Sequence, residues 1–388
     1  MVRTIRIVSG LVLFAFVAMH LVNVAFGLRS IAAMDAARPY FMAVWTNPPG
    51  SLILMAAFLA HFALGLVAIY RRNTLRVSVT DGVQIAASLV VVPLLTPHIV
   101  GTALAARFGI EPSFATLIPY FWIWAPEEGL RQVLLLAFLW IHGCVGVFTW
   151  ARIQPWWTRV GAALHPLAVA IPVLALLGFV GAGNEAIEAI DNPPAVSADT
   201  PPPGEAYGAA VEAEPAEAGD DAQAASHLSR DEILAILSRV NWTTFYLYLG
   251  VIAAVLVARQ VRLAGERDTV RIAFADGPVV SARAGLSVLE IAEQKNVAIA
   301  HLCRGRARCG TCRVHLAGGD AALPEPDREE AQTLARVGAA PGERLACQLR
   351  PGPGTLAVER VLAPYVRPGD LHRLPATAVP AAPEGTAA

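Results

Sequence analysis

The chain has 388 residues, of which 55% are hydrophobic and only 16% are charged, and its formal net charge is −1. Its mean hydropathy of +0.51 excludes an ordinary soluble protein of this length. The apolar excess lies in the first 262 residues, so a membrane region is expected there.

Six apolar runs in this region are each long enough to cross a bilayer, which takes roughly 20 residues of helix. They cover about residues 5–28, 51–70, 81–104, 131–150, 160–182 and 242–260. The first run has a signal-peptide character because Arg3 and Arg6 precede its apolar core. That core is long, however, and no clean small-x-small cleavage site follows it, so we expect a retained helix.

Arginines predict the orientation of these helices. They cluster at every second boundary between the runs, and loops on the cytoplasmic side of a membrane carry an excess of Lys and Arg. Both termini are therefore predicted to be cytoplasmic. The arginines concerned are Arg3, Arg6, Arg71, Arg72, Arg76, Arg152, Arg159, Arg259 and Arg262.

Residues 184–240 are then predicted to form an external loop. The segment has twelve acidic residues against two basic ones and is rich in proline. Such a composition indicates disorder. A solvated spacer without a function of its own is the simplest interpretation.

Each of the first four runs carries one histidine: His20, His61, His98 and His142. An ionisable side chain inside a membrane is costly, so a functional role is the first hypothesis. For any single one of them, a core histidine bonded to a neighbour stays an alternative. The set has a pattern, because counting ~1.5 Å per residue from the cytoplasmic ends puts two histidines ~24–27 Å deep and two ~14–15 Å deep.

This depth pattern predicts how the histidines pair. In an up-down bundle, helices one and three are diagonal partners, and so are helices two and four. His20 then faces His98, and His61 faces His142, which is the geometry of two b-type haems with two axial imidazoles each. The sequence has no CxxCH motif for covalent haem attachment. His165, near a helix end, and Cys144, off the face of His142, are not expected to be ligands.

Residues 268–362 have the units of a small mixed domain. VRIAF (270–274) and PVVSAR (278–283) predict a hairpin, and SVLEIAEQKN (287–296) predicts a helix with Ser287 as its N-cap and Glu290 in a capping box. CRVHLA, RLACQL and TLAVERV predict further strands.

Four of the five cysteines lie in this region, three in HLCRGRARCGTC (301–312) and one in RLACQ. The CxxxxxCxxC spacing with a distant fourth cysteine differs from the paired CxxC knuckles of zinc ribbons and is close to the pattern of 2Fe–2S proteins. A zinc site stays open as an alternative. A disulfide scaffold is disfavoured, because thiols stay reduced on the predicted cytoplasmic side.

The order of these elements resembles the β-grasp fold of 2Fe–2S ferredoxins of the adrenodoxin type. The resemblance implies one 2Fe–2S cluster with four ligands, which are Cys303, Cys309, Cys312 and Cys347. The expected fold class is therefore a membrane all-α six-helix bundle followed by a small α+β domain.

Residues 1–262, with SGLVLFAFVAMHLVN, AHFALGLVAIYRRNTLR, PHIVGT and WIHGCVGVFTWARIQPWW, also resemble a known family. They are similar to the six-helix anchors of bacterial class III adenylate cyclases, which in turn resemble the dihaem cytochrome b subunits of fumarate reductase and succinate dehydrogenase. The resemblance implies haem ligation by the four histidines and a place in the bacterial inner membrane. The sequence ends in a tail, 363–388, expected to be disordered, and no cyclase domain follows the ferredoxin region.

The expected function is one-electron transfer between two b haems and a cytoplasmic 2Fe–2S cluster, and the resemblance implies a membrane quinone pool as the partner of the haems. The preferred use is a redox sensor for a separate, cyclase-like output, and the alternative is a quinone-linked oxidoreductase subunit that serves a soluble acceptor. The expected partners are the lipid bilayer, the quinone and a cytoplasmic protein, with no nucleic acid. That protein is expected to be acidic, because Arg304, Arg306, Arg308 and Arg313 surround the cysteines.

Overall fold

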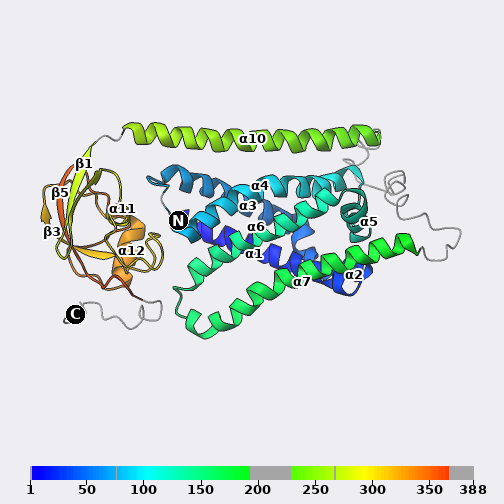
Figure 1. The fold of residues 1–388 in the computed structure, drawn as a ribbon, viewed down its shortest axis with the longest axis horizontal. Helices are drawn as coiled ribbons and strands as arrows, with labels where there is room; N and C mark the ends of the chain where they lie inside the picture. The colour runs from blue at the N-terminus through cyan, green and yellow to red at the C-terminus, as the bar shows by residue number, and fades with distance from the viewer. Residues whose placement is uncertain (1, 76, 193–228, 266–267, 367–388) are drawn as a thin grey trace, which may run out of the picture. The chain divides into compact units, whose positions relative to one another are not determined.

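The computed structural model describes residues 2–75, 77–192, 229–265 and 268–366 (Figure 1). The chain divides into two compact units. One comprises Met1–Ala68, Val79–Gly146 and Ala163–Val255, and the other comprises Ile69–Ser78, Val147–Ala162 and Leu256–Ala388. Arg76, most of the predicted acidic loop (193–228) and most of the predicted tail (367–388) lie outside the described residues.

Among the described residues, six helices are long and apolar enough to cross a membrane. This agrees with the six runs and makes the chain a multi-pass membrane protein. The helices are α1 (Val2–Ala25), α3 (Pro48–Arg71), α4 (Val79–Ile99), α6 (Pro126–Ala151), α7 (Trp157–Asp191) and α10 (Arg230–Gly265).

The last two helices extend into the segment predicted to be a disordered loop. Residues 184–191 continue α7, and residues 230–240 are the start of α10. The average composition of 184–240 hid this, because Ile233 and Leu237 stand four residues apart and so share one face of a helix. They pack with the buried Val100 and Ala105.

The first four membrane helices pack as a four-helix group in which α1, α3, α4 and α6 run side by side (Figure 1). The rings of Phe14 on α1 and Trp140 on α6 stack with centroids 5.0 Å apart. Trp140 Nε1 also donates a hydrogen bond of 2.7 Å to Ala168 O of α7. On the other side, Tyr248 Oη of α10 donates to Leu89 O of α4 at 2.8 Å.

Short helices that lie between the membrane spans were not predicted. They are α2 (Ile31–Thr46), α5 (Phe114–Pro119) and the π-helical segment η4 (Tyr120–Trp124). The short segments η1 (Phe26–Leu28), η2 (Val100–Leu104, π-helical) and η3 (Ala105–Phe108) continue α1 and α4 within the spans Val2–Leu28 and Val79–Phe108. Asp35 of α2 accepts hydrogen bonds from Phe114 N and Ala115 N at 2.8 and 3.0 Å, so it caps α5. Such a cap joins residues far apart in sequence, which local patterns do not reveal.

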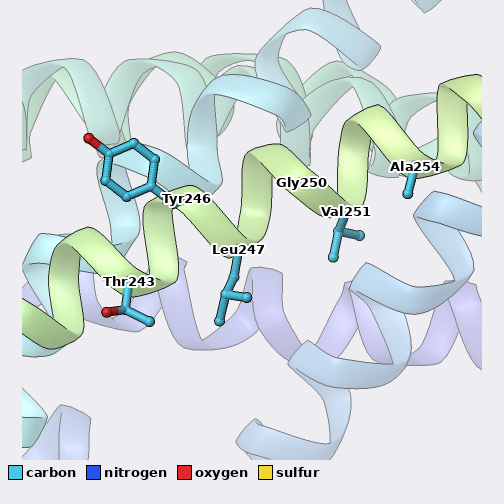
Figure 2. Close-up of a pocket in the computed structure, with 6 residues that line it drawn as sticks. All are labelled: Thr243, Tyr246, Leu247, Gly250, Val251 and Ala254. Atoms are coloured by element: carbon cyan, nitrogen blue, oxygen red, sulfur yellow. The ribbon is translucent and has the colours of Figure 1, made fainter.

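A hollow of about 530 Å³ lies along α10 and is lined by Thr243, Tyr246, Leu247, Gly250, Val251 and Ala254. Successive lining residues are one or three positions apart. Figure 2 shows Thr243, Leu247 and Val251, which are spaced by four, on one side of the helix. The lining is apolar except for two hydroxyl groups, as suits a membrane helix. No histidine takes part in it.

The second unit holds a five-stranded mixed sheet in the order β2-β1-β5-β3-β4. The parallel pair is β1–β5, and the other pairs are antiparallel. The strands are β1 (Thr269–Phe274), β2 (Val279–Arg283), β3 (Arg313–Gly319), β4 (Glu343–Leu345) and β5 (Gly354–Arg360). Two helices, α11 (Val288–Gln294) and α12 (Arg328–Arg336), accompany the sheet.

Most local predictions for this domain are confirmed. The hairpin pairs Val270 with Ala282, and both hydrogen bonds of the Ser287–Glu290 capping box are present. RLACQL is a strand only as far as Leu345, because the chain turns at the last cysteine. The fold class is thus a helical membrane region followed by a small mixed-sheet domain.

Candidate metal centres

The structure brings the four membrane histidines together as two pairs. The ring centroids of His20 on α1 and His98 on α4 lie 6.0 Å apart with an interplanar angle of 65°. Those of His61 on α3 and His142 on α6 lie 6.1 Å apart at 87°. This is the pairing that the depth pattern predicts.

In three of these histidines the Nδ1 atom faces an oxygen. His61 Nδ1 lies 3.3 Å from Arg6 O, His142 Nδ1 lies 3.2 Å from Gln84 O, and His98 Nδ1 lies 2.9 Å from Gln132 Oε1. An Nδ1–H that donates to an oxygen leaves Nε2 without a proton. A metal-ligating histidine has this arrangement, with its second nitrogen bonded to a carbonyl or carboxylate.

The separation of the rings fits a metal between them. Two imidazole nitrogens that each lie about 2 Å from one metal, on opposite sides, place the two ring centroids roughly 6 Å apart. Both pairs have this spacing. A lone core histidine bonded to a neighbour, the simpler interpretation of each residue, does not account for a second histidine opposite it in both cases.

Glycines keep room beside the His61–His142 pair. A Cβ on Gly10 would lie 2.9 Å from His61 Cε1, and a Cβ on Gly143 would lie 2.6 Å from a ring carbon of Phe14. Contacts below 3.0 Å force a neighbour to move. A larger residue at position 10 therefore has to displace the imidazole of His61, and one at position 143 has to displace the ring of Phe14.

Asn23 is a buried polar residue near the other pair. It follows His20 by three residues, so it lies on the same face of α1, and its relative exposure is 0%. Neither its Nδ2 nor its Oδ1 has a hydrogen-bond partner among the described residues. Buried amides are normally bonded, so this side chain fits a site that takes a polar ligand group or water.

Other polar residues of the membrane region lie in surroundings that differ from those of the paired histidines. His165 is exposed on α7. Cys144 packs with the apolar cluster around Leu21 and Trp140. Asp35 caps α5, and Glu128 Oε2 accepts a hydrogen bond of 2.5 Å from Arg131.

The cysteines of the sheet domain are buried in a loop with an unusual backbone. Cys303, Cys309, Cys312 and Cys347 are 1–5% exposed. Between the first two, Arg304, Gly305 and Ala307 have φ of 55°, 74° and 50°. Left-handed residues in such numbers turn successive N–H groups toward the inside of a loop, as in backbone nests that bind anions.

These N–H groups point at sulfur. Arg308 N lies 3.4 Å from Cys303 Sγ, and Cys303 N lies 3.3 Å from Cys309 Sγ. The pKa of the Cys303 thiol is lowered to about 5 by the hydrogen bond from the Cys309 thiol and by the N–H groups of Arg306, Arg308 and Cys309. The pKa of Cys309, the other member of that pair, is raised.

Side chains complete the surroundings of the sulfurs. Thr311 Oγ1 lies 3.0 Å from Cys309 Sγ, and Gln348 Nε2 donates to Cys347 Sγ at 3.3 Å. Hydrogen bonds to ligand sulfurs are one of the means by which proteins set the potential of an iron–sulfur cluster. The sequence pattern did not identify Gln348, although it adjoins a cysteine.

The four thiols come together as two hydrogen-bonded pairs, Cys303 with Cys309 and Cys312 with Cys347. Four buried thiols can hold a tetrahedral zinc ion or the two irons of a 2Fe–2S cluster.

One of the four predicted surface arginines is not at the surface. Arg313 is 4% exposed, and its Nη1 lies 3.0 Å from Glu343 Oε2. It starts β3 directly before Val314 of the core, so the two side chains lie on opposite faces of the sheet, and both are buried. The expected docking surface is therefore reduced to Arg304, Arg306 and Arg308.

Comparisons with known proteins bear on this domain. Residues 275–352 match the family described as 2Fe-2S iron-sulfur cluster binding domain. The 2Fe-2S ferredoxin of Escherichia coli K12 is 34% identical over 85 residues, which are 22% of this chain and 77% of that protein. Through this domain the chain belongs to the 2Fe-2S ferredoxin family.

A second ferredoxin agrees with this result. The 2Fe-2S ferredoxin of Haemophilus influenzae is 36% identical over 85 residues, 22% of this chain and 75% of that protein. No solved structure matches the chain. The ferredoxin domain implies electron transfer and a 2Fe–2S cluster, here in a chain that also has a membrane-spanning region.

Proposed function

We propose that this protein is a membrane electron-transfer module that carries two b-type haems and one 2Fe–2S cluster. One haem lies between His20 and His98 and the other between His61 and His142. The cluster lies on Cys303, Cys309, Cys312 and Cys347. The observation that carries the proposal is the doubled histidine arrangement, with ring centroids 6.0 and 6.1 Å apart.

The chain's own residues prepare these sites. Arg6 O, Gln84 O and Gln132 Oε1 accept the Nδ1 protons of three histidines and so leave Nε2 as the ligand atom. The N–H groups around Cys303 favour its thiolate, which is the form that binds iron. Haem and cluster, when bound, supply reversible one-electron chemistry.

A quinone pool in the membrane is the proposed partner of the haems. The support for it is the likeness of residues 1–262 to the dihaem cytochrome b subunits. The arginines at alternate helix ends support cytoplasmic termini, and the likeness to the bacterial anchors supports a bacterial inner membrane. The ferredoxin domain then lies on the cytoplasmic side. A cytoplasmic protein then exchanges electrons with, or responds to, the cluster.

Two functions fit such a module, and they differ in whether electron transfer continues while quinol is supplied. A redox sensor for a separate, cyclase-like output equilibrates with the quinone pool and stops. A quinone-linked oxidoreductase subunit reduces a soluble acceptor as long as quinol is supplied. The resemblance to cyclase anchors favours the sensor, and continuous quinol-dependent reduction of a soluble acceptor by the purified protein would favour the subunit.

Single histidine variants test the haem assignment. His61→Ala and His142→Ala should each remove the absorbance of the haem between these two residues and leave the other haem. His20→Ala and His98→Ala should each remove that other haem and leave the first. His165→Ala, which changes an exposed histidine of α7, should leave both. Retention of both haems in all four variants would refute the assignment, and loss of a haem in His165→Ala would make α7 a ligand helix.

A further inference from the structure

The two histidine pairs differ in what accepts the proton on Nδ1. For the His61–His142 pair the acceptors are main-chain carbonyls, Arg6 O and Gln84 O, and the Ser9 hydroxyl also lies 3.4 Å from His61 Nδ1. For the His20–His98 pair it is a side chain, Gln132 Oε1 of α6, at 2.9 Å from His98 Nδ1. A side chain can be exchanged by mutation, and a main-chain carbonyl cannot. The properties of the second pair are therefore open to tuning by a single residue.

The orientation of the Gln132 amide follows from the chemistry of the pair. An amide presents an oxygen that accepts and an NH₂ group that donates. With Oε1 toward His98, Nδ1 holds the proton and the Nε2 lone pair is free for a ligand. The reverse orientation places the proton on Nε2 and blocks ligation. Only the arrangement in the structure suits a metal-binding histidine.

The backbone around His98 is unusual and limits how the imidazole can be aimed. Pro93 and Pro97 lie within α4, and the π-helical segment η2 begins two residues after His98. Thr102 Oγ1 donates to His98 O at 2.6 Å. Interruptions of this kind re-aim side chains and occur often at functional sites. Gln132 then fixes the rotation of the ring itself.

Gln132 is well separated from the other pair. It precedes His142 by ten residues of α6, which is about 15 Å along a helix. Its hydrogen bond therefore acts on one pair only. The second pair serves as a reference within the same molecule.

We propose that Gln132 is the positioning residue of the His20–His98 pair, fixing the tautomer of His98 and setting its electron donation to the bound metal. The inference rests on the proposed haem ligation. A neutral amide accepts the Nδ1 proton weakly, and a carboxylate accepts it strongly and makes the imidazole a better donor, which favours the oxidised metal. With Gln132, the metal bound by the His20–His98 pair should thus have a higher potential than with a carboxylate at this position. It should have a lower potential than with an apolar residue there.

The test is a redox titration of the full-length purified protein, monitored by optical spectra and by EPR of the low-spin haem signals. The variants are Gln132→Leu, which removes the acceptor, and Gln132→Glu, which strengthens it. The haem signal assigned to His20–His98 is the one that is absent in His20→Ala. Its potential should rise in Gln132→Leu and fall in Gln132→Glu. The other component should keep its potential and its EPR signal in both variants.

Gln154→Leu is the matched control. The Gln154 side chain donates to Trp150 O, so its loss removes an amide without changing the acceptor of either histidine pair, and both potentials should stay unchanged. If Gln132→Leu loses the haem of its pair, retention with a lowered potential in Gln132→Glu still supports the proposal. Loss of that haem in both variants, equal shifts of both components, or no shift in either variant would overturn it. Absence of haem from the wild-type protein would instead refute the proposed function.

Discussion

At the residue scale, the histidines and their pairing could be predicted from sequence. The groups that accept their Nδ1 protons could not. An ionisable residue stands out in an apolar run, and counting residues gives its depth. Gln132 lies 34 positions from His98, and nothing near it in the sequence indicates that it faces an imidazole. The main-chain acceptors Arg6 O and Gln84 O have no sequence signal at all.

The cysteines differ, because their spacing alone indicates the kind of site. Left-handed residues between Cys303 and Cys309 turn the chain into a loop around the sulfurs. Gly305 and Gly310, with φ of 74° and 73°, suit such a loop because glycine takes this conformation without strain. The hydrogen bonds of Thr311 and Gln348 become visible only in the folded domain.

Serine substitutions test the four cluster ligands. Cys303→Ser, Cys309→Ser, Cys312→Ser and Cys347→Ser should each abolish or strongly alter the EPR signal of the reduced 2Fe–2S centre, because oxygen replaces a ligand sulfur. Cys144→Ser is the control, since Cys144 packs in an apolar cluster of the membrane region, and the signal should stay. Purified wild-type protein with zinc and without acid-labile sulfide would instead support a zinc site.

At the element scale, hydropathy predicted the six long helices because each buries about 20 apolar residues in the bilayer. It missed α2 and α5, which are stabilised by contacts between distant residues. Asp35 caps α5 across some eighty positions, and Met34, fully buried, packs against Ile118. The ends of α7 and α10 were misjudged because composition was averaged over a long segment.

The helix α12 was also missed, and it holds the most buried charge of the ferredoxin domain. Glu330 is 1% exposed and accepts hydrogen bonds from Arg344 Nε and Nη2, both at 2.9 Å, and from Leu345 N at 2.8 Å. Removing one partner of a buried pair leaves the other charge uncompensated. This contact ties α12 to β4, directly before the last cysteine.

Glu330→Ala should therefore destabilise the ferredoxin domain by about 3–5 kcal/mol. The urea midpoint at which the visible circular dichroism of the cluster is lost should fall clearly. Glu325→Ala, which removes an exposed carboxylate from the loop before α12, should change the stability by less than about 0.5 kcal/mol. An unchanged midpoint for Glu330→Ala would show that the buried pair contributes little.

At the scale of the whole molecule, the chain joins a membrane region to a ferredoxin domain, and positively charged side chains lie beside the cysteines of that domain. Arg304, Arg306 and Arg308 are partly exposed, whereas Arg313 is buried against Glu343. Sequence reasoning overcounted this surface, because nothing near Arg313 in the sequence indicates its contact with Glu343, 30 positions away.

Charge reversal tests whether these arginines guide an acidic partner. In the reduced protein, Arg306→Glu and Arg308→Glu should slow reoxidation of the cluster by ferricyanide, an anionic acceptor, because steering by opposite charge raises the rate of encounter. The wild-type rate should fall as salt rises. Cluster content should stay constant, since it is the main-chain N–H groups of these residues that face Cys303.

Arg271→Glu is the control for this experiment. Arg271 is exposed on β1, outside the cysteine loop, and its reversal should change the rate little. A rate that responds neither to salt nor to reversal at Arg306 and Arg308 would place the docking surface elsewhere. The arginines would then act only on the potential of the cluster.

The measurement that tests the central claim most directly is a dithionite-reduced minus oxidised spectrum of the purified protein, with haem, iron and sulfide counted per chain. We predict two low-spin b haems, two non-haem irons and two acid-labile sulfides. A protein with an intact cluster and no haem absorbance would contradict the account, because the two histidine pairs would then have no metal to hold.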